Sequence, residues 1–171
     1  MNAKPPRPPR VVVGVDASSL AGLRALRCAV DEARRRKAQL HAIRVWAFNG
    51  TTRSAYQLIE QHRGAAIAAV ESAFAEAMGE VPFDLDVVLQ VVAGGNPARI
   101  LVQSANGDQD LLVVGASGGG ALRRFLRRSV ARSCAKHAVC PVLVVPPTAF
   151  ARQASHHSIA RDVERDLLQP T

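Results

Sequence analysis

The chain has 171 residues, 48% of them hydrophobic, which fits one domain of ordinary size and excludes a chain that is disordered throughout. The net charge is +8, from 22 basic and 14 acidic residues. Such an excess can attract nucleic acid, anionic lipid or phosphorylated ligands, or can simply keep a protein soluble. No stretch approaches the roughly 18 apolar residues of a membrane-spanning helix, and the first ten residues lack a signal peptide's apolar segment.

The three cysteines do not form a Cys-x-x-Cys pair, which favours a reducing compartment and thiols that act as small hydrophobic side chains. We therefore expect a cytoplasmic protein that spans no membrane. The sequence divides into a flexible Pro-rich leader (residues 1–10), one domain (residues 11–147) and a tail (residues 148–171). In the tail, Ile159, Val163 and Leu167 recur at helical spacing. This segment could be a helix that docks on the domain or on a partner, or a frayed and solvated end.

Five short apolar runs within the domain are typical of buried strands: residues 11–15, 40–46, 85–92, 111–115 and 142–145. Four of them lack strict alternation, as expected for parallel strands that are covered on both faces. The second run fits less well, because His41 and Arg44 interrupt it.

Helical patterns separate these runs. The first follows Ser18 and Ser19, the second ends near Gly79, the third begins at Asn96-Pro97, and the fourth starts near Ser129. Residues 47–58, which contain an Asn-Gly pair, are expected to form a loop. The alternation predicts an α/β fold of the Rossmann-like type, a single doubly wound five-stranded parallel sheet with helices on both faces.

In an open α/β sheet, ligands bind beyond the carboxyl ends of the strands, so the residues after each strand are the candidate site. The first such stretch is Gly14-Val15-Asp16-Ala17-Ser18. Asp16 could bind a ribose hydroxyl or a magnesium ion there. It could equally serve as the N-cap of the following helix, which stabilises a helix by roughly 1 kcal/mol.

The second stretch follows the fourth strand and contains Gly115, Ser117, Gly118, Gly119 and Gly120. Glycines allow successive backbone N–H groups to turn toward one concavity, which suits phosphate oxygens. Ser129 and Val130, at the start of the fourth helix, could add further N–H donors. The other interpretation is a flexible Gly-rich connector.

The sequence lacks the motifs of several other functions. No Gly-Lys-Ser/Thr completes a Walker A loop, and no GxGxxG follows the first strand. The histidines have no ligand-like spacing, the serines lack a GxSxG context, and the aromatic residues are too few for a nucleic-acid stacking platform. We therefore expect no metal site of the protein's own and no nucleic-acid partner.

These motifs resemble the ATP-binding branch of the universal stress protein family, over residues 11–145. The motif of that branch is Gly, two residues, Gly, nine residues, then Gly-Ser or Gly-Thr. Here Gly115-x-x-Gly118 is followed by nine residues and then by Arg128-Ser129. The strand that ends in Arg44-Val45-Trp46 and the last strand, after Cys140-Pro141, also match.

The resemblance implies that ATP, with or without Mg²⁺, binds to this chain. Asp16 would lie near the ribose or metal, and Val45 would offer its backbone to the adenine. Gly115, Ser117 and Gly118 would line the phosphates together with Ser129 and Val130. It also implies a homodimer that pairs through the last strand, Val142 to Val145.

Two positions depart from the family pattern. Arg128 replaces a glycine, so its side chain could block the site or could grip the phosphates with its guanidinium. Ala17 replaces a frequent glycine after Asp16. The resulting expectation is a nucleotide-binding regulatory module of the stress response and not an enzyme. The alternative is a dimeric stress protein that binds no nucleotide and acts through protein association.

Overall fold

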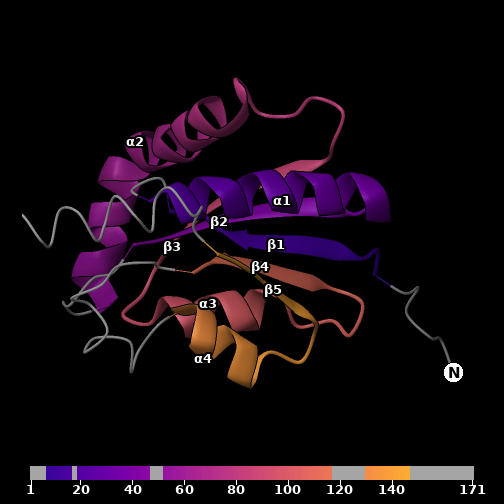
Figure 1. Ribbon diagram of the computed structural model, residues 1–171. Helices are drawn as coiled ribbons and strands as arrows, with labels where there is room; N and C mark the ends of the chain where they lie inside the picture. The colour runs from indigo at the N-terminus through magenta and orange to yellow at the C-terminus, as the bar shows by residue number, and fades with distance from the viewer. Residues whose placement is uncertain (1–6, 17–18, 47–51, 117–129, 147–171) are drawn as a thin grey trace, which may run out of the picture.

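The computed structural model describes residues 7–16, 19–46, 52–116 and 130–146. Within these ranges strands and helices alternate along the chain in the predicted order (Figure 1). The strands are β1 (Arg10–Gly14), β2 (Gln39–Trp46), β3 (Val87–Ala93), β4 (Leu111–Gly115) and β5 (Val142–Val145). The helices are α1 (Leu20–Arg36), α2 (Thr52–Met78), α3 (Pro97–Ser104) and α4 (Val130–His137). None of the helices in these ranges is long and apolar enough to cross a membrane.

The five strands form one parallel sheet in the order β3-β2-β1-β4-β5. The chain builds outward from β1 through β2 to β3, and then returns to add β4 and β5 on the other side. Strand order therefore reverses between β1 and β4, where Val13 of β1 pairs with Val113 of β4. This arrangement confirms the predicted doubly wound sheet.

Two apolar layers cover the sheet, one on each face. On one face, Val11 and Val13 of β1 pack with α1 and α2. On the other, Val12 packs with α3 and α4. Figure 1 shows the same division, with α1 and α2 above the sheet and α3 and α4 below it. Because both faces of the sheet are buried, consecutive residues of a strand must be apolar. This explains why the strands appear in the sequence as continuous apolar runs.

The expected helix starts are present at α1 and α3. Ser19 is the N-cap of α1, and its side chain accepts a hydrogen bond from the Gly22 N–H. Asn96 is the N-cap of α3, with Pro97 directly after it. The Ser19 and Asn96 side chains each accept a hydrogen bond from an N–H group that a helix leaves without a partner in its first turn. Pro97 has no N–H group, so it removes one of these donors.

Two boundaries differ from the sequence predictions. Residues 52–58 are helical, because α2 begins at Thr52, so the predicted loop over residues 47–58 is wrong in its second half. Good helix-forming residues such as Gln57 and Leu58 favour this extension, whereas Asn49-Gly50 lies outside the described residues. The flexible leader is also wrong for its last residues, since β1 begins at Arg10 and Arg7 is bound to Asp110. Residues 1–6 and the predicted tail at 148–171 lie outside the described residues.

Asp110 anchors the N-terminal segment at the amino end of the sheet. Its buried carboxylate accepts hydrogen bonds from the side chains of Arg7 (2.6 Å) and Arg10 (3.0 Å) and from the Gly107 N–H (3.0 Å). Burial by itself would raise the pKa of Asp110. The hydrogen bonds from Arg10 and Gly107 and the two positive charges outweigh that effect and lower the pKa below its ordinary value.

Candidate functional site

A cavity with a volume of about 580 Å³ opens at the carboxyl ends of β1, β2 and β4. Its described lining comes from the strand ends and from the starts of three helices: Gly14, Val15, Asp16, Ser19, Gly22, Ile43, Arg44, Val45, Pro97, Leu101, Val114, Gly115 and Val130. The cavity therefore lies where the strand order reverses, which is the position that open α/β sheets use for ligands. Its volume is within the range of ordinary small-molecule sites, about 300–1,000 Å³.

The topology directs helix N-termini toward this cavity. Each helix after a parallel strand starts at the strand's carboxyl end, so Ser19 of α1, Pro97 of α3 and Val130 of α4 all lie on the wall. A helix N-terminus carries N–H groups without intrahelical partners and a partial charge of about +0.5. The arrangement favours an anionic ligand.

Asp16 is held at the cavity wall by Ser19. The Ser19 hydroxyl donates a hydrogen bond to Asp16 Oδ2 at 2.9 Å and accepts one from the Gly22 N–H at 3.0 Å. The sequence left open whether Asp16 binds a ligand or caps α1. The cap is Ser19, and the Asp16 carboxylate lines the cavity.

Glycines allow α1 to lie close against the strand ends. A Cβ atom on Gly22 would fall on the backbone carbonyl of Asp16, far inside van der Waals contact. On Gly115, a Cβ would come within 2.8 Å of the Ala21 carbonyl oxygen. Gly115 was predicted as a ligand contact, and it lines the cavity, but the packing of α1 also requires its missing side chain. Gly22 was not recognised from the sequence, because a glycine inside a helical pattern usually indicates only a weaker helix.

The described wall is mostly apolar, with a few polar groups. Ile43, Val45 and Leu101 form part of the apolar surface, and all three belong to or pack on the apolar layer under α3 and α4. The charged residues of the described lining are Asp16 and Arg44. An apolar wall with a few fixed polar groups is the usual composition of a small-molecule site.

The structure brings together part of the predicted site. Gly14, Asp16, Val45, Gly115 and Val130 all line the cavity, although they are distant in sequence. The other predicted positions lie outside the described residues: Ala17, Ser117, Gly118, Gly119, Gly120, Arg128 and Ser129. Lining residues that lie outside the predicted candidate stretches are Ser19, Gly22, Ile43, Arg44, Pro97 and Leu101. The sequence did contain a signal for Pro97, because Asn96-Pro97 marks the start of a helix after a strand. Such a residue must lie at the carboxyl edge of a parallel sheet, where the cavity opens.

Comparison with known proteins agrees with this architecture. The model of the universal stress protein family matches residues 9–146. A universal stress protein solved in complex with cAMP is 26% identical, with a TM-score of 0.58, and the match covers 82% of this chain and 98% of that one. UspA from Lactobacillus plantarum is 24% identical, with a TM-score of 0.59 and coverage of 82% and 99%.

A universal stress protein family member from Arabidopsis thaliana, solved with AMP bound, is 20% identical with a TM-score of 0.54, and the match covers 84% of this chain and 95% of that one. The sheet order, the cavity at the strand-order reversal and a family match over most of the sequence lead to one conclusion. The chain belongs to the universal stress protein family.

Proposed function

We propose that this protein binds an adenine nucleotide, ATP in the first instance, and acts as a regulatory module in the stress response. The observation that carries the proposal is the cavity at the strand-order reversal, with three helix starts on its wall. The related protein that is 26% identical was solved in complex with cAMP, which supports an adenine nucleotide as the ligand.

The described residues fit such a ligand. Ile43, Val45 and Leu101 offer an apolar surface to the base, and the backbone of Val45 would meet its polar edge. Asp16 would accept a hydrogen bond from a ribose hydroxyl or bind Mg²⁺ that accompanies the nucleotide. Gly115 and Val130 would face the phosphates, and the predicted roles of residues 117–120, Arg128 and Ser129 extend this surface.

Regulation is a better account of the cavity than catalysis. Ser19 is the hydroxyl-bearing side chain of the described lining, and its oxygen is committed to Asp16 and to the Gly22 N–H. Both hydrogen bonds hold the start of α1 against Asp16, which is a structural role for this hydroxyl. Bound nucleotide would act by favouring one conformation or surface, which a partner then recognises.

Titration calorimetry of the nucleotide-stripped protein with ATP, with and without Mg²⁺, tests the proposal. We expect micromolar or tighter binding, and a weaker response in Asp16→Asn when Mg²⁺ is present. No heat and no thermal stabilisation at millimolar ATP would contradict it and favour the alternative, a protein that acts through association alone. Arg128→Gly then separates a blocked site, in which ATP affinity rises, from an arginine that contacts phosphate, in which it falls.

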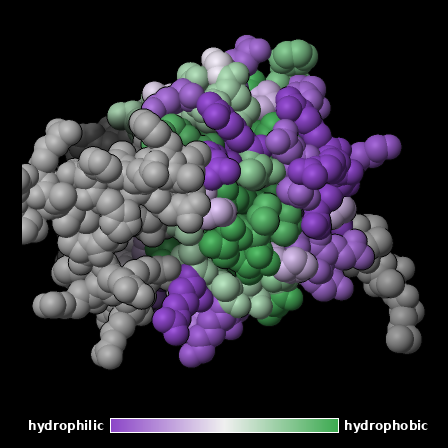
Figure 2. All heavy atoms as spheres, viewed as in Figure 1, coloured by the Kyte–Doolittle hydropathy of each residue, from purple (hydrophilic) through white to green (hydrophobic). Residues whose placement is uncertain are grey.

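The proposal includes a homodimer that pairs through β5. This strand lies at one edge of the sheet, and Val144 is 39% exposed. Figure 2 shows hydrophobic residues gathered over the region that β5 occupies in Figure 1. An unpaired apolar edge strand invites pairing with another chain.

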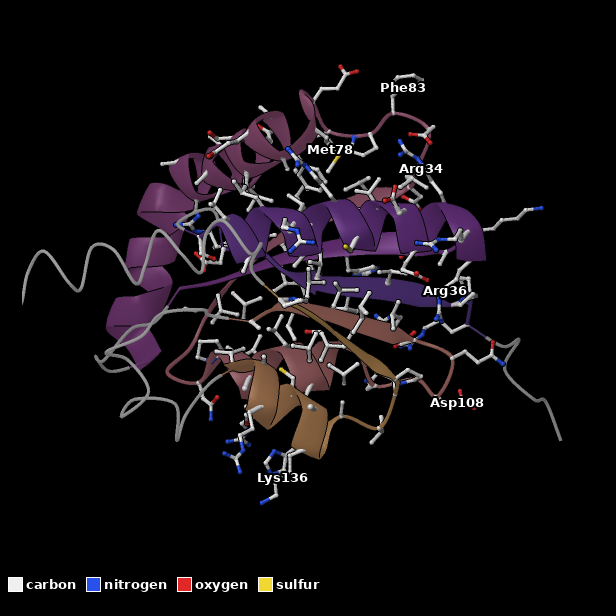
Figure 3. All side chains as sticks on the ribbon, in the orientation of Figure 1. Arg34, Arg36, Met78, Phe83, Asp108 and Lys136 are labelled. Atoms are coloured by element: carbon white, nitrogen blue, oxygen red, sulfur yellow. The ribbon has the colours of Figure 1, made fainter. Side chains whose placement is uncertain are left out.

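The dimer is tested by Val144→Lys, with Phe83→Lys as the matched control, in sedimentation velocity. Phe83 is 90% exposed and points outward from the segment between α2 and β3 (Figure 3). We expect Val144→Lys to shift the protein toward monomer and Phe83→Lys to leave it dimeric. A monomeric wild type would contradict the dimer.

A further inference from the structure

β3 is one of the two edge strands of the sheet, and no strand of the described chain pairs with its outer side. It has seven residues, whereas β5 at the opposite edge has four. All seven are at least partly exposed, although the neighbouring strand β2 contributes fully buried residues such as Leu40 and Ile43. The N–H and C=O groups on the outer side of β3 therefore have no partner strand in the described sheet.

β3 lacks the features that usually prevent an edge strand from pairing with another chain. Such features are a charged side chain, a proline, a bulge or a very short length. The strand from Val87 to Ala93 contains no charged residue and no proline. Its register with β2 runs without interruption from Leu40 with Val87 to Trp46 with Ala93, so it has no bulge. An uncharged and unbroken strand of this length is suited to pairing with a further strand.

The sequence of β3 is complementary to itself. Gln90 is the central residue of the seven, so two copies of the strand that pair antiparallel about a two-fold axis at Gln90 overlap along their whole length. Residues at equal distances on either side of Gln90 then lie opposite one another, and each of these pairs is apolar. The pairs are Leu89 with Val91, Val88 with Val92, and Val87 with Ala93.

The centre and the flank of the strand also permit this pairing. Gln90 would lie opposite Gln90 of the copy, and an amide both donates and accepts hydrogen bonds, so it can bind its own copy. The Gln90 side chain is exposed, on the α3 and α4 side of the sheet, because it pairs in register with Ile43 of that layer. Asp86, directly before the strand, would lie opposite Gly94, which carries no charge.

We propose that the outer edge of β3 is an interface between two copies of this chain, which pair antiparallel with Gln90 at the two-fold axis. The interface is separate from the β5 edge and does not depend on a nucleotide. It would join dimers that are paired through β5. Because each joined pair of dimers still presents a β3 edge at both ends, the assembly would grow with protein concentration.

Charges placed at the two-fold axis test the proposal. Gln90→Lys brings two ammonium groups face to face, and Gln90→Glu brings two carboxylates together, so each variant alone should repel its copy. An equimolar mixture of the two variants brings an ammonium group opposite a carboxylate and should associate again. Gln103→Lys and Gln103→Glu are the matched controls, because Gln103 is exposed on α3 and is not part of the strand.

Sedimentation velocity of the full chain at rising concentration measures the association. We expect wild type and both Gln103 variants to grow beyond the β5 dimer, and Val144→Lys to stop at two chains at high concentration. Each Gln90 variant alone should weaken the association by about tenfold or more, because like charges that face each other cost several kcal/mol, and the mixture should restore most of it. No growth in the wild type, or a mixture that behaves like its separate components, would overturn the inference. A wild type that passes only from monomer to dimer, in a step that Gln90 controls, would support β3 pairing and contradict the β5 dimer.

Cross-linking carries the test if the charged variants do not fold. In a Cys28→Ser background, which removes the partly exposed native thiol, mild oxidation should link Gln90→Cys chains into covalent dimers. Directly opposed residues of an antiparallel pair have Cβ atoms about 4.5–5.5 Å apart, close to the reach of a disulfide. Gln103→Cys in the same background is the control and should cross-link more slowly. Equal rates for the two variants would overturn the inference.

Discussion

The Ser19 hydroxyl lies 2.9 Å from Asp16 Oδ2 and donates a hydrogen bond to it, while it accepts one from the Gly22 N–H at 3.0 Å. One side chain therefore caps α1 and fixes a carboxylate on the cavity wall. The stability of the helix start and the geometry of the candidate site depend on the same atom. Ser19 is the N-cap of the helix, and Asp16 is a wall residue of the cavity.

Ser19→Ala should lower the free energy of unfolding by about 1 kcal/mol, because the first turn of α1 loses its side-chain acceptor. Urea denaturation measures this loss. Ser104→Ala is the matched control, since the Ser104 hydroxyl bonds to the Ile100 carbonyl within α3 and caps no helix start. A loss no larger than that of the control would show that the cap contributes little.

Gly22→Ala should destabilise the protein by about 3 kcal/mol or more, because the new methyl group would fall on the Asp16 carbonyl and force α1 away from β1. Gly95→Ala is the control, since a Cβ there meets no atom within 4 Å, and it should change stability by less than about 0.5 kcal/mol. Thermal and urea unfolding compare the two variants. Similar stabilities would mean that α1 can move without cost.

The order of elements and the edge of the sheet that holds the cavity could be predicted from the sequence. Buried parallel strands produce apolar runs such as residues 111–115, and parallel topology brings the residues after each strand together. The role of Gly22 could not be predicted. It depends on how closely α1 approaches the end of β1, which is set by tertiary packing and not by local pattern.

Asp110 shows the same limit at the opposite edge of the sheet. In sequence it is one acidic residue before an apolar run. In the structure it is 1% exposed and binds Arg7 and Arg10, which are 103 and 100 residues away. No local signal connects residues at that separation. The segment at residues 7–10 was therefore interpreted as part of a free leader, although its two arginines anchor it to β4.

Asp110→Asn should lower the free energy of unfolding by about 3 kcal/mol at pH 7, because Arg10 is left partly buried without its counter-charge. Asp108→Asn is the control, since this side chain is exposed at the molecular surface (Figure 3). Urea denaturation of both variants gives the difference. An equal effect of the two substitutions would show that the Asp110 ion pairs contribute nothing net.

Asp110 should also make stability depend on pH in the acid range. Its pKa is lower in the folded protein than the ordinary value of about 3.9, so the unfolded chain binds more protons as the pH falls. The contribution of Asp110 is therefore complete well above pH 3.9 and is lost as the pH falls through that value toward the folded pKa. Unfolding free energies between pH 6 and pH 3 should fall less steeply in Asp110→Asn than in the wild type. Parallel curves would contradict the assignment.

The thiols should divide into one accessible and two protected groups. Cys134 and Cys140 are buried in the layer between the sheet and α3 and α4, whereas Cys28 of α1 is partly exposed. Burial, with a smaller contribution from the nearby Cys140, raises the pKa of Cys134 to about 11, and burial also raises the pKa of Cys140. At pH 8, only about 0.1% of a thiol with that pKa is ionised, and the thiolate is the form that reacts.

Titration with a disulfide reagent at pH 8 should therefore modify Cys28 first in the folded protein, and all three thiols at similar rates in denaturant. Cys28→Ser should remove the fast phase and leave the slow one. Equal rates for the three cysteines in the folded wild type would show that the layer under α3 and α4 opens freely. A slow phase that tracks global unfolding would instead show that Cys134 and Cys140 serve as small hydrophobic side chains of the core.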